Sequence, residues 1–228
     1  PTTVATNLHH HLAENLNSLE RTINLMNHSE LKKRFVIYGP QFYSSPKFMR
    51  LMDILMSEPD LQIEYHDYET VKESVEELLN FRKADIVLSM SPVCNRALIC
   101  EPFLELDTTV VCRKDHPRLG DSATLDEILQ ERFTFFITKE LNITQQQLRE
   151  NSFYSQRQYG FYSSSIIAII NALKQSDLVG ILPVPFFETF RESFHLKSVA
   201  IPAPMMKLPL YIIYNRSMPV SESFNRII

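Results

Sequence analysis

Residues 84–89, Ala-Asp-Ile-Val-Leu-Ser, form a short apolar run that is typical of a strand buried on both faces of a sheet. Two earlier runs also have strand character, residues 34–38 and the alternating segment 61–65. Between these three predicted strands, apolar residues recur at helical spacing over 48–55 and 71–79. This order of strands and helices predicts a βαβαβ unit with a parallel sheet.

A second series of the same kind follows in the chain. We expect strands at 133–137, 158–162 and 178–182, helices at 142–150 and 163–175, a final strand at 208–214 and a final helix from 221 to 228. Two α/β halves in series imply a cleft between them. Ligands of open α/β sheets lie beyond the carboxyl ends of the strands, so we expect a ligand site in that cleft.

The first thirty residues carry a different pattern. Leu12, Leu16, Leu19, Ile23 and Met26 occupy the a and d positions of a heptad repeat. The spacing predicts an amphipathic helix over roughly residues 7–28. This helix either packs on its own domain or serves as a dimerising or connecting helix. It is too short to form a stable coiled coil without support from outside it.

Composition narrows the function classes. The chain has 228 residues, of which 44% are hydrophobic and 22% charged, with a net charge of −4. This acidic balance argues against a surface that grips nucleic acid, since phosphate contacts need a basic face. No apolar run is long enough to span a membrane, and the N-terminal residues do not form a secretory signal. Three cysteines at irregular spacing predict free thiols, a cytoplasmic location and no metal framework.

No enzyme or cofactor signature is present. The four glycines lie too far apart for a GxGxxG motif or a P-loop, and there is no GxSxG or HExxH motif. Cys94 follows a predicted strand and is the best candidate for a nucleophile. However, no neighbouring base in the sequence would lower its pKa, so an incidental thiol is the favoured interpretation. We therefore expect no catalytic residue, no cofactor and no metal.

Residues 102–119, PFLELDTTVVCRKDHPRL, carry a family resemblance. They resemble the crossover strand of the effector-binding (regulatory) domain of LysR-type transcriptional regulators, in which an apolar residue and an acid precede a valine-rich strand closed by His-Pro. Residues 124–129 are similar to the helix that follows this turn, and residues 176–183 resemble the family's glycine, apolar strand, proline signature. The strand at 84–88 and the heptad helix at 8–28 match the remaining parts of the domain, in the expected order.

The resemblance implies an α/β fold of two Rossmann-like subdomains, arranged as in type 2 periplasmic binding proteins and preceded by a linker helix. Two crossover strands near residues 108–114 and 208–214 would join the subdomains. The implied divisions are residues 1–30 for the linker helix, 34–112 plus 212–228 for subdomain I, and 113–211 for subdomain II. The winged helix-turn-helix domain that binds DNA in this family is expected to be absent from this chain.

The resemblance also implies a function. A small-molecule effector of unknown identity would bind in the cleft and shift the population of subdomain arrangements. The linker helix would pass this change to DNA-binding domains in a homodimer or homotetramer, without contact to a membrane. Two alternatives share the bilobal fold. One is a solute-binding protein, opposed by the lack of an export signal, and the other is an enzyme, opposed by the lack of a nucleophile–base pattern.

Candidate effector contacts follow from the strand ends. They are Pro40, Ser44, Ser45, Ser89, Met90 and Ser91 in the first half, and Thr138, Tyr162, Ser163, Ser164 and Pro183 in the second half. Serines at a helix start combine hydroxyls with free N–H groups and can bind an anion, although each serine could equally be a simple N-cap. Lys139 is the only basic residue at these strand ends, so an anionic effector would rely on backbone donors.

The resemblance finally implies a dimer interface. In the family, the first helix of the regulatory domain pairs with the opposite subdomain of a second copy. Phe48, Leu51 and Met52 lie on this helix and are the corresponding interface candidates. The alternative is that these three side chains belong to the core of their own chain.

Overall fold

The computed structural model describes residues 12, 15, 16, 19, 33–41, 45–138 and 152–217. The helices predicted at 142–150 and 221–228 lie outside these residues, as does most of the predicted N-terminal helix. The four described N-terminal residues are helical, in agreement with that prediction. Leu12, Leu16 and Leu19 are 53%, 60% and 57% exposed, so this face of the helix is not packed on the rest of the chain.

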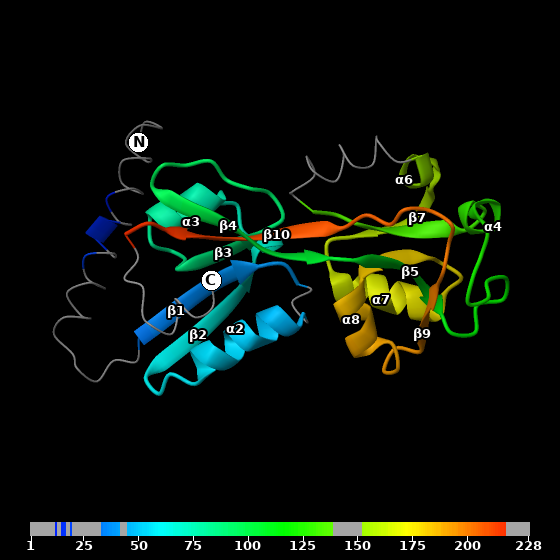
Figure 1. Cartoon of the computed structure of the whole chain (residues 1–228), viewed down its shortest axis with the longest axis horizontal. Coiled ribbons are helices and arrows are strands. Elements are labelled where there is room, and N and C mark those ends of the chain that lie inside the picture. The colour runs from blue at the N-terminus through cyan, green and yellow to red at the C-terminus, as the bar shows by residue number, and fades with distance from the viewer. Residues whose placement is uncertain are drawn as a thin grey trace.

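The first half contains a five-stranded sheet in the order β2-β1-β3-β10-β4 (Figure 1). Its strands are β1 (Lys33–Gly39), β2 (Leu61–Asp67), β3 (Ile86–Ser89), β4 (Leu98–Leu106) and β10 (Leu208–Asn215). β1 pairs in parallel with β2 and β3, which confirms the predicted parallel βαβαβ unit. β10 comes from the far end of the chain and pairs antiparallel with β3 and β4.

Helices cover both faces of this sheet. Successive residues of β3 point to opposite sides, so β3 presents apolar side chains to the helices on each face. Ile86 and Leu88 belong to the same apolar cluster as the buried side chains of α2 (Pro46–Met56). Val87 belongs to the cluster that contains the buried side chains of α3 (Val75–Asn80). A short 3₁₀ helix, η1 (Tyr68–Thr70), follows β2.

The second half repeats this plan. Its strands are β5 (Thr108–Arg113), β6 (Arg132–Phe136), β7 (Gln158–Ser163), β8 (Gly180–Pro183) and β9 (Leu196–Val199). β5 pairs antiparallel with β8 and β9, and β6 pairs in parallel with β7. The Thr134 N–H donates to the Val179 carbonyl at 2.8 Å, which places β6 beside the start of β8. The three-stranded sheet β8-β5-β9 and the two-stranded sheet β6-β7 thus lie side by side in the order β7-β6-β8-β5-β9, which corresponds strand for strand to the first sheet.

The helices of the second half also lie on two faces. α7 (Ile166–Gln175) and α8 (Val184–Phe190) contribute to the same core cluster as α2 of the first half, so one apolar core runs through both halves. α4 (Leu125–Leu129) and α6 (Ser152–Gln156) cover the other face over a separate cluster. Figure 1 shows α7 and α8 on one side of the second sheet and α4 and α6 toward the other.

Two connections join the halves. The chain leaves the first sheet after β4, at Asp107, and returns to it at Leu208 after residues 200–207. The predicted divisions at 112/113 and 211/212 differ from this strand pairing, because every paired residue of β5 has its partners in the second sheet and every residue of β10 in the first. The two connections are tied together by the Thr108 hydroxyl, which donates to the Met206 carbonyl.

Within the described residues, no helix is long and apolar enough to cross a membrane. The same part of the chain contains no cluster of three or more His, Cys, Asp or Glu side chains suited to a metal ion. Its three cysteines are free thiols, as the irregular spacing predicted.

Candidate functional site

A cavity of about 120 Å³ lies where the two halves meet. The first half supplies Met90, directly after β3, and Leu208, the first residue of β10. The returning connection supplies Met206, and the second half supplies the rest of the lining: Thr134, Phe135, Phe136, Thr138, Tyr154, Arg157, Ile166, Ile169, Ile181, Leu182 and Pro183. The lining is therefore mainly apolar, with three hydroxyl groups and a single guanidinium, a combination that suits a small organic ligand.

Three of the predicted effector contacts line this cavity. Met90 and Thr138 follow the carboxyl ends of β3 and β6, and Pro183 ends β8. The buried Thr138 hydroxyl donates across the junction to Oε1 of Glu69, which lies in η1 of the first half. The rule that ligands collect at strand ends therefore pointed to three residues that line the cavity.

Other predicted residues make local contacts and are not among the lining residues. The Ser45 hydroxyl caps α2 by accepting the Phe48 N–H at 3.3 Å. The Ser89 hydroxyl donates to the Ser91 carbonyl at 2.9 Å and accepts the N–H of the same residue. The Ser163 hydroxyl accepts the Ser165 N–H at 3.0 Å. Ser45 is thus an N-cap, which was the alternative interpretation, whereas Ser89 and Ser163 bond to backbone groups two residues further along the chain.

The remaining predicted contacts do not line the cavity or lie outside the described residues. Pro40 is buried, and its carbonyl accepts the Tyr65 hydroxyl proton at 2.7 Å. Tyr162 is 57% exposed, with its ring centroid 5.6 Å from that of Phe135. The Ser164 carbonyl oxygen accepts a hydrogen bond from Nε2 of Gln41. Ser44 and Lys139 lie outside the described residues.

Gln41 connects the two halves and was not among the predicted contacts. Its Oε1 accepts the Ile166 N–H at 2.9 Å, and its Nε2 donates to the Ser164 carbonyl at 3.2 Å. The same Nε2 donates to the carboxylate of Asp67 in the first half. Gln41 directly follows Pro40, which was predicted as an effector contact because it lies at the end of a strand. A long amide side chain at that strand end was the available signal.

Arg157 is the second residue that sequence reasoning missed. It lies just before β7, at a strand start, whereas the predicted contacts follow strand ends. Its guanidinium lies over the rings of Phe133, Phe153, Tyr154 and Tyr159. The expectation that an anionic effector would rely on backbone donors did not take this side chain into account, which folding brings to the cavity wall.

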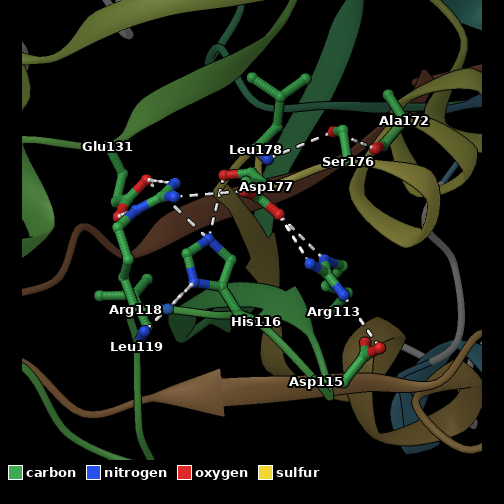
Figure 2. A network of polar contacts seen from close by, with 10 residues as sticks. All are labelled: Arg113, Asp115, His116, Arg118, Leu119, Glu131, Ala172, Ser176, Asp177 and Leu178. Carbon is green, nitrogen blue, oxygen red and sulfur yellow. Dashed lines mark hydrogen bonds and ion pairs between the residues drawn. The ribbon is translucent and has the colours of Figure 1, made fainter.

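A polar network on the same half stands apart from the cavity lining (Figure 2). Arg113 donates to Oδ1 of Asp177 at 2.8 Å and pairs with Asp115 at 2.9 Å. These hydrogen bonds hold the pKa values of both carboxyl groups below their ordinary range. Arg118 pairs with the buried carboxylate of Glu131 through two nitrogens, at 2.6 and 2.7 Å. The network joins the turn after β5 to the start of β8.

The predicted interface residues are part of the core. Phe48 and Leu51 are 2% and 0% exposed, and Met52 packs against the same cluster. The α2 side chains that do face solvent include Met49 and Met56, which are 47% and 67% exposed. Phe48 and Leu51 therefore leave no surface for a partner, as the alternative interpretation held.

Comparisons with known proteins agree with this architecture. The family model described as the LysR substrate binding domain matches residues 34–228. A curated relative, the uncharacterized HTH-type transcriptional regulator YbdO of Escherichia coli (strain K12), is 40% identical over 228 residues, which are all of this chain and 76% of the relative.

Two solved structures illustrate the shared fold. Full-length CbnR complexed with its target DNA has a TM-score of 0.70 at 12% identity, over all of this chain and 80% of that chain. The effector-binding domain of QuiR in complex with shikimate has a TM-score of 0.64 at 16% identity, over 85% of this chain and 92% of that chain. The matched relatives are transcriptional regulators and not enzymes. With two corresponding sheets exchanging strands through paired connections, and a family match over residues 34–228, this chain belongs to the LysR substrate-binding domain family of transcriptional regulators.

Proposed function

We propose that the cavity between the halves binds a small-molecule effector and that binding changes how the halves are arranged. The main support is that both halves and a connection between them contribute to its lining. Met90 and Leu208 come from the first half, while Met206 belongs to the returning connection. A ligand with different contacts in two arrangements would shift the equilibrium between them, by no more than its difference in affinity.

Hydrogen bonds lead from the cavity wall to both connections. The Tyr154 hydroxyl accepts the Met206 N–H at 2.7 Å. The Met206 carbonyl in turn accepts the hydroxyl proton of Thr108, the first residue after the outward connection. Displacement of the Tyr154 ring by a ligand would therefore act on the two points about which the halves can move.

We propose that the effector contacts Met90, Thr138 and Pro183, the three predicted residues that line the cavity. The effector-binding domain of QuiR, which shares the fold, was solved in complex with shikimate. That complex supports a small organic molecule as the class of effector. Thr138 has a second proposed role, because its bond to Glu69 spans the junction. A ligand at Thr138 would compete with or reinforce this contact.

A thermal-shift screen with small organic acids, amides, amino acids, sugars and alcohols tests the proposal. A ligand at 100 times its Kd stabilises a protein by about 2.7 kcal/mol, which gives a clear increase in Tm. Ile181→Trp fills the cavity and should remove the response. Ile167→Trp, at a 49% exposed position of α7 that does not line the cavity, should retain it.

A saturable hit that is recovered unchanged and lost only in Ile181→Trp supports effector binding. An identical response in both variants, or no response from any compound in the screen, would refute binding in this cavity. Consumption of the hit would instead favour an enzyme on this fold. Because Ile181→Trp could disturb packing, Ile181→Phe serves as a second variant that adds less volume to the same space.

We also propose that the chain self-associates as a homodimer or homotetramer in a regulator that works in the cytoplasm and binds DNA through a helix-turn-helix part. The exposed leucines at 12, 16 and 19 support association through the N-terminal helix, since they form an apolar stripe at heptad spacing. The net charge of −4 supports assigning DNA contacts elsewhere. Sedimentation velocity should show species above 26.6 kDa that Leu16→Gln weakens, and a monomer at high concentration would refute association.

A further inference from the structure

The guanidinium of Arg157 is enclosed by aromatic rings on the wall of the cavity. Its central carbon lies 4.7 Å from the ring centroid of Tyr154 and 5.2 Å from those of Phe133 and Tyr159. The ring of Phe153 is 5.8 Å away. Such rings attract a cation through their quadrupoles and fix its position, but they do not neutralise its charge.

Among the described residues, no carboxylate pairs with Arg157. Its one recorded hydrogen bond runs from Nε to the Tyr154 carbonyl and is long, at 3.4 Å. A guanidinium has five N–H donors, so most of its donor capacity is unused within the described part of the chain. Arg113 and Arg118 of the same half differ in this respect, because each pairs with two carboxylates.

The electrostatic surroundings of Arg157 lead to the same conclusion. Burial lowers the pKa of its guanidinium, and the opposing influences come from Tyr159 and Tyr154 rather than from an acidic residue. A half-buried cation is costly when the described residues supply no counter-ion, and the cost falls when an anion binds beside it.

The alternative anion receptor, the start of α7, is already engaged. The Ile166 N–H donates to Oε1 of Gln41, and the Ala168 N–H donates to the Ser165 hydroxyl at 3.3 Å. The Tyr154 ring, by contrast, lines the cavity beside Arg157, and its hydroxyl accepts only the Met206 N–H. Its own proton has no acceptor among the residues that the structure describes.

We propose that the cavity binds a small organic monoanion, a carboxylate whose oxygens pair with Arg157 and whose apolar body lies against Ile169, Ile181 and Leu182. This rests on the proposed function and names the chemical class of its effector. One cation matches one negative charge, and a planar guanidinium matches a carboxylate through two parallel hydrogen bonds. An apolar cavity of roughly 150 Å³ can hold benzene. The cavity here is slightly smaller, at about 120 Å³, so the apolar body of the ligand can be no larger than a single six-membered ring.

Matched pairs of probes separate charge from shape. Benzoate and benzamide share a ring, and 3-methylbutanoate and 3-methylbutanamide share a branched chain, so each pair differs mainly in charge. Isothermal titration calorimetry should find at least one carboxylate binding roughly 10- to 100-fold more tightly than its amide, the ratio expected for hydrogen bonds to a charged group.

Variants assign that preference to one residue. Arg157→Met should remove the preference for the carboxylate, and Arg157→Lys should keep part of it, because charge remains while the paired geometry is lost. Arg132→Met serves as the control. It removes an exposed arginine from neighbouring strand β6 that does not line the cavity, and the preference should persist.

Equal binding of acid and amide, failure of both carboxylates to bind, or a preference that survives Arg157→Met would overturn the anion assignment. These outcomes differ from failure of the proposed function. If neutral compounds of the screen bind and Ile181→Trp abolishes their binding, the cavity is an effector site and only its assignment to an anion is wrong. Arg157→Lys provides a folded comparison if Arg157→Met proves unstable.

Discussion

Nε2 of His116 lies 3.0 Å from the carbonyl oxygen of Asp177, and this contact joins the turn after β5 to the start of β8 (Figure 2). On the other side of the ring, Nδ1 accepts the Leu119 N–H at 3.2 Å. Because Nδ1 accepts, the ring proton is on Nε2, and the imidazole donates to Asp177 in its neutral form. The His-Pro turn that carried the family resemblance is thus a structural link.

Replacing His116 with alanine should destabilise the protein by roughly 2–4 kcal/mol, because backbone groups on both sides of the buried ring lose their partners. Urea unfolding measures the change. His195→Asn is the matched control, since His195 is exposed and has a φ of 53°, which asparagine tolerates. Similar unfolding midpoints for the two variants would contradict the role assigned to His116.

The Arg118–Glu131 pair should behave as a coupled unit. Glu131 is 5% exposed, so Arg118→Met leaves a buried carboxylate with less compensation and should lower the urea midpoint of unfolding. The double variant Arg118→Met/Glu131→Gln should recover part of that loss, because the uncompensated charge is gone. A double-mutant cycle in urea measures the coupling, and additive single effects would argue against it.

The sequence predicted the elements that depend on local pattern. The apolar run of β3 and the helical spacing in α7 both encode their structure within a few residues. It did not predict β9, whose four residues show no clear alternation, and its subdomain divisions at 112/113 and 211/212 differ from the positions at which the chain passes between the sheets. Strand exchange between sheets is decided by hydrogen bonds between residues about a hundred positions apart, which local patterns do not contain.

The candidate site was harder to predict for the same reason. Serine hydroxyls at strand ends were expected in the cleft, but Ser45 and Ser163 satisfy nearby backbone N–H groups, a local contact that competes with ligand binding. Arg157 is held at the cavity by aromatic rings that come from two elements, Phe133 of β6 and Phe153 and Tyr154 of α6. Neither the spacing nor the type of these residues marks them as one site.

Removal of the Gln41 side chain should weaken the junction at one hydrogen bond, the one that the Ile166 N–H donates to Gln41. Gln41→Ala leaves the Ile166 N–H without its acceptor, so hydrogen exchange at that amide should accelerate. Exchange at Ile169 should change little, because its N–H donates to the Ser165 carbonyl at 3.1 Å. Equal acceleration at both amides would indicate general fraying of α7, and unchanged exchange at Ile166 would show that Gln41 does not hold the junction.

Two glycines provide a matched test of packing. A Cβ at Gly180 would lie 2.9 Å from Cδ1 of Leu173 and 3.0 Å from Oγ1 of Thr134, whereas at Gly120 the nearest atom is 3.7 Å away. Gly180→Ala should therefore cost roughly 1–3 kcal/mol through overpacking. Gly120→Ala should be neutral or stabilise by up to about 1 kcal/mol, since alanine restricts the unfolded chain. Equal Tm values for the two variants would refute the crowding of Gly180 between α7 and β6.

Cys112 should make the protein sensitive to alkaline conditions. Its side chain is buried, and burial raises the pKa of the thiol to about 11, against the influence of Lys197 and Arg113. Between an unfolded pKa near 9 and this value, the folded state holds a proton that the unfolded state has released. Stability therefore falls as pH rises through this interval, by up to roughly 2 kcal/mol.

The Cys112 effect is separable from that of other groups that titrate at the same pH. Tyr38, Tyr159 and Tyr214 also have raised pKa values because of burial, so the wild-type curve contains several contributions. Cys112→Ala should be less stable at neutral pH, because it leaves a small cavity, but should lose less stability between pH 9 and 11. Cys94→Ala, at an exposed thiol, should follow the wild-type slope. Parallel curves of stability against pH for the two variants would mean that the Cys112 thiol ionises equally in the folded and unfolded states. Such a result would contradict the effect expected from its complete burial between β8 and β9.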